Sequence, residues 1–311
     1  MYYFRMFKRW FLMFSGKSQF HQAQILGKNF IPGKLYGYPS DLTNKINWQG
    51  KVNDNGIIIN KLTNGEEIYF PIAIAQKALG HYDYFLLHNN ESDIQTFLNY
   101  TDFLLNSMTH EGLISTWHKQ ERGYLNNYSA MTQGQVISCC CRAYIYTGNL
   151  LYKNAAIRAS FHLRNLTDKK LLVKLNENDL ALSECPNNNL EIVLNGWIFS
   201  LWGLLDLALI VSDKDLHNLN TILIQSLSNQ LKYFDNGIWS KYDNNKNIAS
   251  PFYHELHIQQ LMAMYQITNI DTFIIYKEKW IEYNKSRFKK SIAILLKIKQ
   301  KLLMRKYNEF I

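Results

Sequence analysis

The chain has 311 residues, of which 47% are hydrophobic, so it is long enough to bury one large core or two small ones. Its net charge of +9 comes from the ends: the segment from Asn284 onward holds nine basic residues and one acid, and the first 17 residues hold four basic residues and no acid. The body between them is mildly acidic, which excludes nucleic acid as the expected partner, since a nucleic-acid-binding domain carries its basic patch on the folded body.

The first 60 residues form the least regular part of the predicted structure. Residues 2–14 are aromatic with interspersed cations and lack the uncharged core and the small-residue cleavage site of a signal peptide. Residues 18–60 are rich in turn formers, residues 56–59 are typical of a strand, and residues 63–66 are typical of a tight turn. We therefore predict a basic aromatic N-terminus and an irregular, partly β lead-in over residues 1–60.

Helical spacing of apolar residues begins at Pro71, a residue suited to a first helical turn. Polar, turn-prone links separate the helical stretches, and few strands are predicted. Antiparallel helix pairs around an axis are the natural arrangement, so we predict a mainly α fold, an incomplete α/α toroid over residues 61–284, with the active site at one end. The further helical stretches are residues 92–108, 129–147, 150–164, 191–211, 214–232, 254–267, 270–283 and 286–307.

Residues 285–311 are predicted to form a basic amphipathic C-terminal helix. At about 100° per residue, its apolar and basic residues fall on opposite faces, and Lys299 lies among the apolar ones. Such a helix either lies on an anionic membrane or packs on the body with a solvated basic face. No run approaches the ~20 apolar residues that span a bilayer. The apolar face holds Ile292, Leu295, Leu296, Leu302 and Leu303, and the basic face holds Lys290, Lys297, Lys301 and Arg305.

The four cysteines contain no CxxC pair. Cys139, Cys140 and Cys141 are consecutive, so on a helix they point in three directions and cannot share a metal. This usage indicates a reducing compartment. We predict a cytoplasmic protein with no metal or cofactor, in a peripheral position on the inner face of the membrane if the C-terminal helix binds lipid.

Three short signatures lie in the second half of the chain. Residues 127–135 read Asn-Tyr-Ser-Ala-Met-Thr-Gln-Gly-Gln; residues 184–186, Glu-Cys-Pro, stand ten residues before residues 194–196, Leu-Asn-Gly. The tyrosine of Lys-Tyr-Asp at residues 241–243 stands eleven residues before that of Tyr-His-Glu-Leu-His at residues 253–257. Together they resemble the C-terminal catalytic domain of the D-glucuronyl C5-epimerases. The resemblance runs from about Tyr69 to about Tyr283 and implies the same toroid fold and a uronate-containing polysaccharide as partner.

Inversion at C5 of a uronate makes two demands on a site. A proton α to a carboxylate has to leave and another has to return from the opposite face, which needs two acid/base groups. Positive charge or strong hydrogen-bond donors have to stabilise the enediolate that forms. The resemblance assigns the acid/base work to tyrosines, with a glutamate and basic groups nearby.

Carried over residue by residue, the resemblance places catalytic tyrosines at Tyr242 and Tyr253. The third tyrosine of the family follows a glutamate, and here Cys185 follows Glu184. A thiol is more acidic than a phenol by about 1.5 pK units and is a competent acid/base near neutrality. Cys185 therefore either serves one face of the sugar or is a small buried cysteine in a site that has lost activity. The family arginine three residues after the first tyrosine is Asn245 here.

The remaining candidates are polar or aromatic residues of the same signatures, expected to bind the sugar or its carboxylate. For Gln133 and Gln135, which flank Gly134, helix packing is the alternative, and a buried Asn195 could equally have structural partners. His254 and His257 stand one turn apart, as two metal ligands would, but no third ligand is evident. The predicted substrate-binding residues are Tyr69, Tyr128, Gln133, Gln135, Asn195, Asn245, His254 and His257.

Three functions remain open from the sequence. The first is a C5-epimerase that inverts D-glucuronate to L-iduronate in a polysaccharide or its lipid-linked precursor. The second is an inactive relative that binds such a glycan. The third is a lyase or an inverting hydrolase; a lyase shares the proton abstraction at C5, and a hydrolase needs two carboxylates roughly 6.5–9.5 Å apart, for which Glu184 and Asp243 are the candidates.

Overall fold

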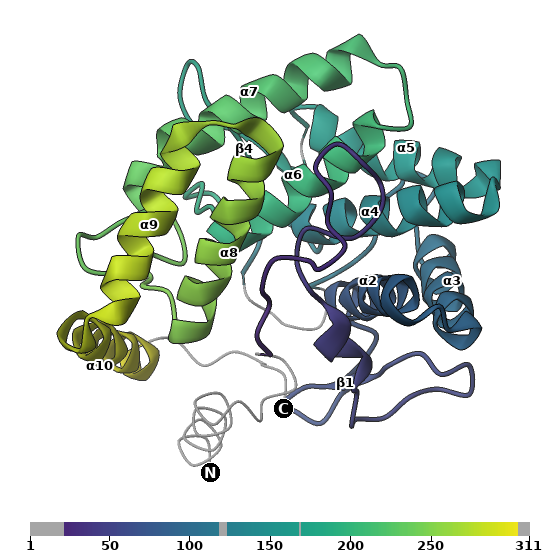
Figure 1. The fold of residues 1–311 in the computed structure, drawn as a ribbon, viewed down its shortest axis with the longest axis horizontal. Helices are drawn as coiled ribbons and strands as arrows, with labels where there is room; N and C mark the ends of the chain where they lie inside the picture. Colours follow the sequence, from purple (N-terminus) through teal and green to yellow (C-terminus); the bar gives the residue numbers. More distant parts are fainter. Residues whose placement is uncertain (1–21, 118–122, 168, 304–311) are drawn as a thin grey trace.

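The computed structural model describes residues 22–117, 123–167 and 169–303, and within these ranges the protein is mainly helical (Figure 1). The predicted aromatic run at residues 2–14 and the predicted basic-face residue Arg305 lie outside the described residues. The lead-in contains a short 3₁₀ helix, η1, at Thr43–Ile46. It also contains two short strands, β1 at Asn60–Lys61 and β2 at Glu67–Ile68.

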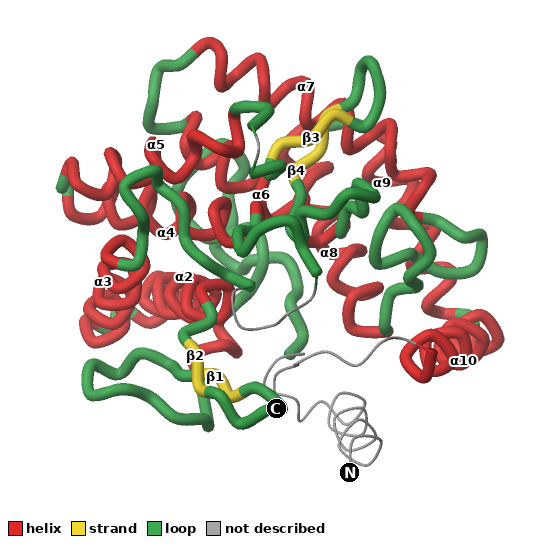
Figure 2. The backbone as a smooth tube through the Cα atoms, turned by 180° about the vertical axis from the view of Figure 1, so that it is seen from behind, coloured by secondary structure: helices red, strands yellow, loops and turns green. Residues whose placement is uncertain are grey.

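The helices of the body form antiparallel pairs packed in an inner and an outer row. Helices α2, α4, α6 and α8 pack in succession as the inner row, and each outer helix packs on the inner helix before it in the chain. Figures 1 and 2 show the pairs following an arc from α2 and α3 to α8 and α9. The predicted incomplete α/α toroid is therefore confirmed. The pairs are α2 (Pro71–His88) with α3 (Glu91–Asn106), α4 (Ala130–Thr147) with α5 (Leu150–Arg164), α6 (Leu194–Ala208) with α7 (Lys214–Gln230), and α8 (Pro251–Thr268) with α9 (Asp271–Lys285).

Helices α4 and α6 approach to backbone contact through two glycines. A Cβ on Gly134 would lie 2.4 Å from the Cα of Ser200, and a Cβ on Gly203 would lie 2.2 Å from the carbonyl oxygen of Gly134. Neither helix could carry a larger residue at its glycine without moving away. The sequence left helix packing as the alternative to substrate binding for the turn around Gly134, and the structure shows that packing at the glycine.

Tyr38 fastens the lead-in to the inner row. Its ring stacks parallel to Phe199 and meets Trp202 edge-on, with centroids 6.4 and 5.7 Å apart. Arg142 lies over the same ring and donates to the carbonyl of Gly37 at 3.2 Å. The guanidinium is fully buried and pairs with Asp206 at 2.6 Å. Residues from the lead-in, α4 and α6 thus share one buried ionic cluster.

The strands differ from expectation in two places. Residues 56–59 contribute only the bridge between Ile58 and Val52, because the Asn53 side chain accepts from the amides of Asn55 and Ile57 and turns the chain there. The predicted turn at residues 63–66 is present between β1 and β2, with Gly65 at φ 95°. The sequence missed a second hairpin, β3 (Leu172–Lys174) with β4 (Leu180–Leu182), which lies beside α6 and α7 (Figure 2).

The last described helix, α10 (Arg287–Leu303), packs beside α9 at the end of the arc. It packs through part of its predicted basic face, since Lys297 is half-buried, and leaves much of its apolar face exposed. The sequence allowed a helix packed on the body with its basic face in solvent, and the structure differs from this at Lys297. The reason is that the loop before α8 offers backbone groups that Lys297 and Gln300 bind. Among the described residues, no helix combines the length and the apolar character needed to cross a bilayer.

Candidate active site

Residues 183–186 leave β4 and run across the start of α6. Their backbone carbonyls are held in turn: that of Ser183 by the amide of Ala130, that of Glu184 by the indole of Trp117, and that of Pro186 by the amide of Leu125. The Glu184 side chain lies against Gly196, where an added Cβ would stand 2.1 Å from Oε2. The Asn-Gly signature therefore has a steric reason, because a glycine at the start of α6 gives the Glu184 carboxylate its place.

Tyr242 lies on a tight loop between η2 (Leu231–Phe234) and α8. Its amide donates to the carbonyl of Asn247 at 2.6 Å, and its carbonyl accepts from the amide of Leu194 at 3.1 Å. An isolated bridge between Val193 and Asp243 continues this contact. The loop is thus fixed to the first residues of α6, next to the Glu184 side chain.

Tyr253 belongs to the first turn of α8, whose N-cap Ser250 accepts from the Tyr253 amide at 3.4 Å. Its ring meets that of Tyr242 in a T-shaped contact with centroids 4.8 Å apart. The two tyrosines that the sequence singled out therefore touch. The first turn of a helix also favours negative charge, which suits a phenol that ionises or an anionic ligand.

Tyr242 is the electrostatic centre of the group. Burial raises the pKa of its phenol well above the usual value of 10, and the neighbouring Glu184, Tyr253, Cys185 and Tyr124 raise it further. These four side chains are thus the ionisable neighbours that act on the Tyr242 phenol. The structure thus brings Glu184, Cys185, Tyr242 and Tyr253 together from three different segments of the chain.

A pair of carboxyl groups stands directly beside Tyr242. Asp243 is buried, and its Oδ1 accepts from the amides of Asn245 and Asn247 at 3.0 and 3.1 Å. Burial raises the pKa of Glu191, and its hydrogen bond with Asp243 and the charge of Asp243 raise it further. Asn247 donates to Glu191 at 3.0 Å and bridges the pair through a second bond to Asp243. The pair therefore holds a proton more firmly than separate carboxyl groups would.

The two predicted histidines lie behind the tyrosines in a buried cluster. His254 stacks on Trp239, donates from Nε2 to the carbonyl of Trp280 at 3.0 Å and accepts at Nδ1 from Ser240. Nδ1 of His257 shares the Ser240 hydroxyl at 3.1 Å. Burial lowers the pKa of His254 to about 3 and that of His257 well below its usual value, so both rings are neutral. Their arrangement supports the tyrosine loop, and contact with a sugar stays a prediction.

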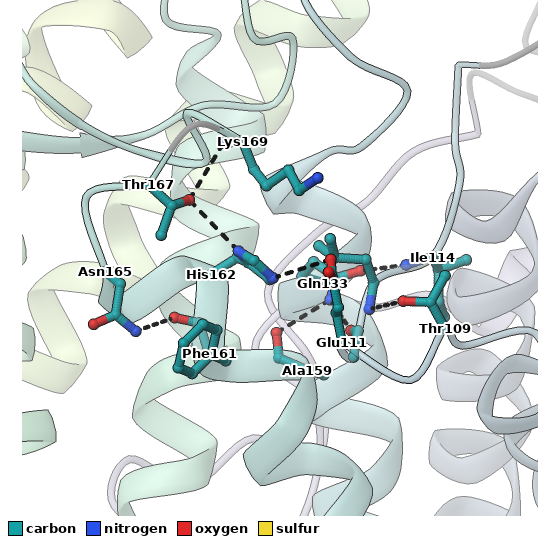
Figure 3. A network of polar contacts seen from close by, with 12 residues as sticks. Thr109, Glu111, Ile114, Gln133, Ala159, Phe161, His162, Asn165, Thr167 and Lys169 are labelled. Carbon is teal, nitrogen blue, oxygen red and sulfur yellow. Dashed lines mark hydrogen bonds and ion pairs between the residues drawn. The ribbon is translucent and has the colours of Figure 1, made fainter.

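Gln133 uses its whole amide to join backbone segments (Figure 3). Its Nε2 donates to the carbonyls of Gly112 and Ala159 at 2.6 and 3.1 Å, and its Oε1 accepts from the amide of Ile114 at 3.1 Å. Figure 3 also shows His162 within an ion-pair distance of Glu111. Gln133 therefore ties α4 to α5 and to the preceding loop, and a sugar contact there stays a prediction.

Gln135 and Asn195 are also buried, but their side chains are less satisfied. Among the residues that the structure describes, neither amide atom of Gln135 has a hydrogen-bond partner, nor does Oδ1 of Asn195. The backbone carbonyl of Asn195 accepts from Gln260 of α8 at 3.2 Å. Buried amides without partners are candidates to bind a polar ligand, and the predicted roles of both residues remain open.

The other predicted binding residues lie farther out. Tyr69 packs on Phe103 of α3, and the structure gives it no contact with the tyrosine pair. Tyr128 lies beneath the ammonium of Lys169. Asn245 is exposed at the tip of the Tyr242 loop. In the described ranges, no group of three or more His, Cys, Asp or Glu side chains is placed to hold a metal ion.

Sequence reasoning missed three side chains of this site. Tyr124 neighbours Tyr242 and meets Trp117 in a T-shaped contact, with centroids 5.6 Å apart. Lys297 of α10 lies with Nζ 5.6 Å from the centroid of the Tyr242 ring. For Tyr124 and Trp117, the aromatic residues of segment 117–128 were a signal in the sequence. For Lys297 there was none, because nothing local to α10 distinguishes it from its neighbouring lysines.

Comparison with known proteins decides the family. Residues 114–282, more than half of the chain, match the family model of the D-glucuronyl C5-epimerase C-terminus. The chain belongs to this family. The match covers every segment that supplies Tyr124, Glu184, Cys185, Tyr242 and Tyr253, and it ends before α10.

Two curated relatives of this epimerase-family chain match half of it. A D-glucuronyl C5-epimerase of Caenorhabditis elegans is 26% identical over 185 residues, which is 50% of this chain and 28% of the relative. An uncharacterized protein of Methanocaldococcus jannaschii is 27% identical over 157 residues, which is 49% of this chain and 51% of the relative. The chain thus spans about half of one relative and under a third of the other.

A solved structure of a UGL variant with dGlcA-Glc-Rha-Glc aligns with 71% of this chain and 61% of its own. The TM-score is 0.45 and the sequence identity 13%. At these values the match is too weak to assign fold or function.

Proposed function

We propose that the protein is a uronate C5-epimerase, which inverts D-glucuronate to L-iduronate in a polysaccharide or its lipid-linked precursor. The observation that carries the proposal is the meeting of Tyr242 and Tyr253 with Glu184 and Cys185 at one place, from segments that the family match includes. Phenol, thiol and carboxyl groups in a desolvated setting are the acid/base groups that removal and return of a C5 proton requires.

Tyr242 acts as the proton donor in this proposal. With its pKa raised well above 10, its phenol enters the reaction neutral and returns a proton to C5 more readily than it takes one. The resulting tyrosinate is then the base for the reverse reaction. Tyr253, in contact with Tyr242 and in the first turn of α8, assists from the same side.

The opposite face of the sugar needs a second group. Two rings 4.8 Å apart leave no room for a sugar between them, so the tyrosines serve one face. Cys185 is the group we assign to the other face, since a thiol titrates nearer neutrality than a phenol. As a thiolate it takes the C5 proton, and Tyr242 donates the proton that returns from the opposite side. The neighbouring Glu184 orients the substrate from its place against Gly196.

Solvent exchange at C5 tests the proposal. In deuterated water, the protein is expected to place deuterium at C5 of heparosan, and Tyr242→Phe, Tyr253→Phe and Cys185→Ala should each lower the exchange at least about tenfold. Cys185→Tyr should move the pH dependence upward, because phenol titrates near 10 and thiol near 8.5. A neutral effect of Cys185→Ala on an active enzyme would remove the thiol from the mechanism.

The same assay separates the competing functions. A lyase also takes the C5 proton, but it releases an unsaturated uronate that absorbs ultraviolet light. An inactive relative binds uronate polymer without exchange, and Cys185→Ala then changes nothing. Either result would replace the epimerase proposal.

We propose in addition that the protein sits peripherally on the cytoplasmic face of a membrane, with α10 against anionic lipid. The exposed face of α10 carries Phe288, Leu295 and Leu303, which are 75, 65 and 77% exposed. Exposed cations at Arg287, Lys290 and Lys299 accompany this stripe. Apolar insertion flanked by positive charge is complementary to an anionic bilayer. The four cysteines are free thiols, as expected in a reducing compartment.

Vesicle sedimentation tests the attachment. Replacing Phe288, Leu295 and Leu303 together by Gln should abolish binding to vesicles of phosphatidylglycerol and phosphatidylcholine, and wild type should not bind phosphatidylcholine alone. The matched control replaces Leu150 and Leu151, which are also exposed, by Gln. If the triple variant binds vesicles as wild type does, lipid attachment through α10 is wrong. If wild type instead self-associates through this face, the occupant is a second copy.

A further inference from the structure

Lys297 is a partly buried cation without an anionic partner. Its Nζ donates to the carbonyl of Ile248 at 2.6 Å, and in the described part of the chain it forms no ion pair with a carboxylate. An ammonium has three donors, so two N–H groups are left for a ligand. A desolvated cation gains most from an anion that reaches it in the same setting.

The position of Lys297 links it to the tyrosine pair. Its Nζ lies over the Tyr242 ring, and it reaches the site from α10, outside the part of the chain that matches the family. Gln300, one turn further along, accepts from the amide of Ile248 at 3.1 Å and donates to the carbonyl of Lys246 at 2.6 Å. Gln300 therefore holds α10 to the Tyr242 loop and keeps Lys297 in place.

The charged groups around Lys297 do not fully compensate the positive charge of its ammonium. The pKa of Lys297 is lowered to about 8, chiefly by burial and also by the neighbouring Lys301, while Asp243 acts in the opposite direction. Asp243 is itself engaged by Glu191, Asn247 and the amide of Asn245. The local balance therefore favours an incoming anion.

We propose that Lys297 binds the carboxylate of the uronate whose C5 lies at Tyr242. This inference rests on the proposed function and deepens it. Loss of the C5 proton places negative charge on that carboxylate, so a fixed ammonium stabilises the enediolate more than the substrate. The cation that the chemistry requires then comes from α10, and the helix is part of the site.

Binding of an acid and of its ester separates this role from a structural one. The probes are a heparosan oligosaccharide and the same oligosaccharide with its carboxylates methyl-esterified, titrated against the full chain at pH 7. Wild type is expected to bind the acid at least about tenfold more tightly than the ester. Lys297→Met should remove that preference by weakening only the acid, Lys297→Arg should keep most of it, and Lys299→Met, at an exposed lysine of the same helix, should keep all of it.

Wild type alone gives a second measurement that does not depend on a variant folding. The affinity for the acid should fall as the pH rises above about 8, where free Lys297 loses its proton, while the affinity for the ester stays level. The proposal is overturned if Lys297→Met weakens acid and ester equally, if Lys299→Met also removes the preference, or if the preference is absent or unchanged up to pH 10.

The result of this binding experiment can be distinguished from the result of the deuterium-exchange assay. A Lys297-dependent preference for the acid without deuterium exchange would keep the carboxylate site and reject the epimerase. Deuterium exchange together with a preference that Lys297→Met leaves unaffected would keep the epimerase and reject the carboxylate site. If neither oligosaccharide binds, both proposals fail.

Discussion

Gly196 and Gly134 both stand where a side chain would collide, yet with different atoms. At Gly196 the added Cβ would meet the Glu184 side chain, 2.1 Å from Oε2 and 2.7 Å from Cβ, whereas at Gly134 it would meet the backbone of α6. The carboxyl group of Glu184 can rotate away, but its Cβ moves only with the backbone, so both glycines are sterically required. One glycine therefore makes room for a functional group and the other for the fold.

Replacing each glycine by alanine should separate these effects. Gly196→Ala is expected to lower the free energy of unfolding by about 1–3 kcal/mol, because the added Cβ would stand 2.7 Å from the Cβ of Glu184. It should also reduce C5 exchange by the folded protein about tenfold or more by displacing Glu184. Gly134→Ala should lower stability by about 1–3 kcal/mol through overpacking. Urea unfolding and the exchange assay measure both, and full activity of Gly196→Ala would contradict the position assigned to Glu184.

Asp83 is a buried carboxyl group whose ionisation opposes folding. Its Oδ1 accepts from the amide of Tyr38 at 3.0 Å, and its Oδ2 has no hydrogen-bond partner. Burial raises the pKa of Asp83 from 3.8 to about 7. Because the folded pKa lies above the unfolded one, the stability it contributes is complete below pH ~4 and is lost as the pH rises through 7.

Asp83→Asn should therefore stabilise the protein more at pH 8 than at pH 5, by about 2 kcal/mol in the free energy of unfolding. The asparagine keeps an oxygen for the Tyr38 amide and carries no charge. Urea titrations at the two pH values measure the difference, with Asp54→Asn, a change at an exposed carboxyl, as the control. An equal effect of Asp83→Asn at both pH values would show that this carboxyl titrates normally.

Helix α4 is held to its surroundings by Gln133 as well as by apolar packing. Three backbone groups from the preceding loop and from α5 depend on this one amide. Backbone groups left buried without partners cost more than the bond they lose. The element is thus positioned by a polar side chain at its N-terminal end.

Gln133→Leu is expected to lower the free energy of unfolding by about 2–4 kcal/mol, because it leaves these three backbone groups buried without hydrogen-bond partners. The folded fraction should retain wild-type affinity for a uronate oligosaccharide, since the amide is already occupied. Gln225→Leu, on the exposed face of α7, is the control for the loss of an amide. A large loss of affinity in folded Gln133→Leu would instead restore the substrate-binding role predicted from the sequence.

At the scale of the whole molecule, one buried ionic cluster joins the lead-in to the inner row of helices. Arg142 reaches Asp206 on α6, the carbonyl of Gly37 and the ring of Tyr38 from α4. These contacts connect segments more than a hundred residues apart. Breaking a buried pair by removing one partner leaves the other charge buried and uncompensated.

Arg142→Met should lower the free energy of unfolding by about 3–5 kcal/mol, and the double change Arg142→Met with Asp206→Leu should recover part of it. Urea unfolding of the two variants and wild type measures this. Limited proteolysis should also cut the lead-in near Tyr38 faster in Arg142→Met. Unchanged stability of the single variant would mean that apolar packing alone holds the lead-in.

The sequence by itself determined the helices and the family signatures. Apolar spacing is a property of residues three or four apart, so it located α2 to α10 with small errors, such as the start of α6 at Leu194 after an extended segment. The short signatures identified Tyr242 and Tyr253, which the structure brings into contact. The domain boundaries at residues 60 and 284 stay predictions.

Only the tertiary structure decided which side chains surround Tyr242. Tyr124, Cys185 and Lys297 reach it from a loop, a strand end and the last described helix, and no local pattern encodes those distances. The crossing of α4 and α6, fixed by backbone contact at Gly134 and Gly203, sets where these segments meet. Lys297 has the same local sequence character as the lysines exposed around it, and only the packing of α10 on the Tyr242 loop makes it a partly buried cation.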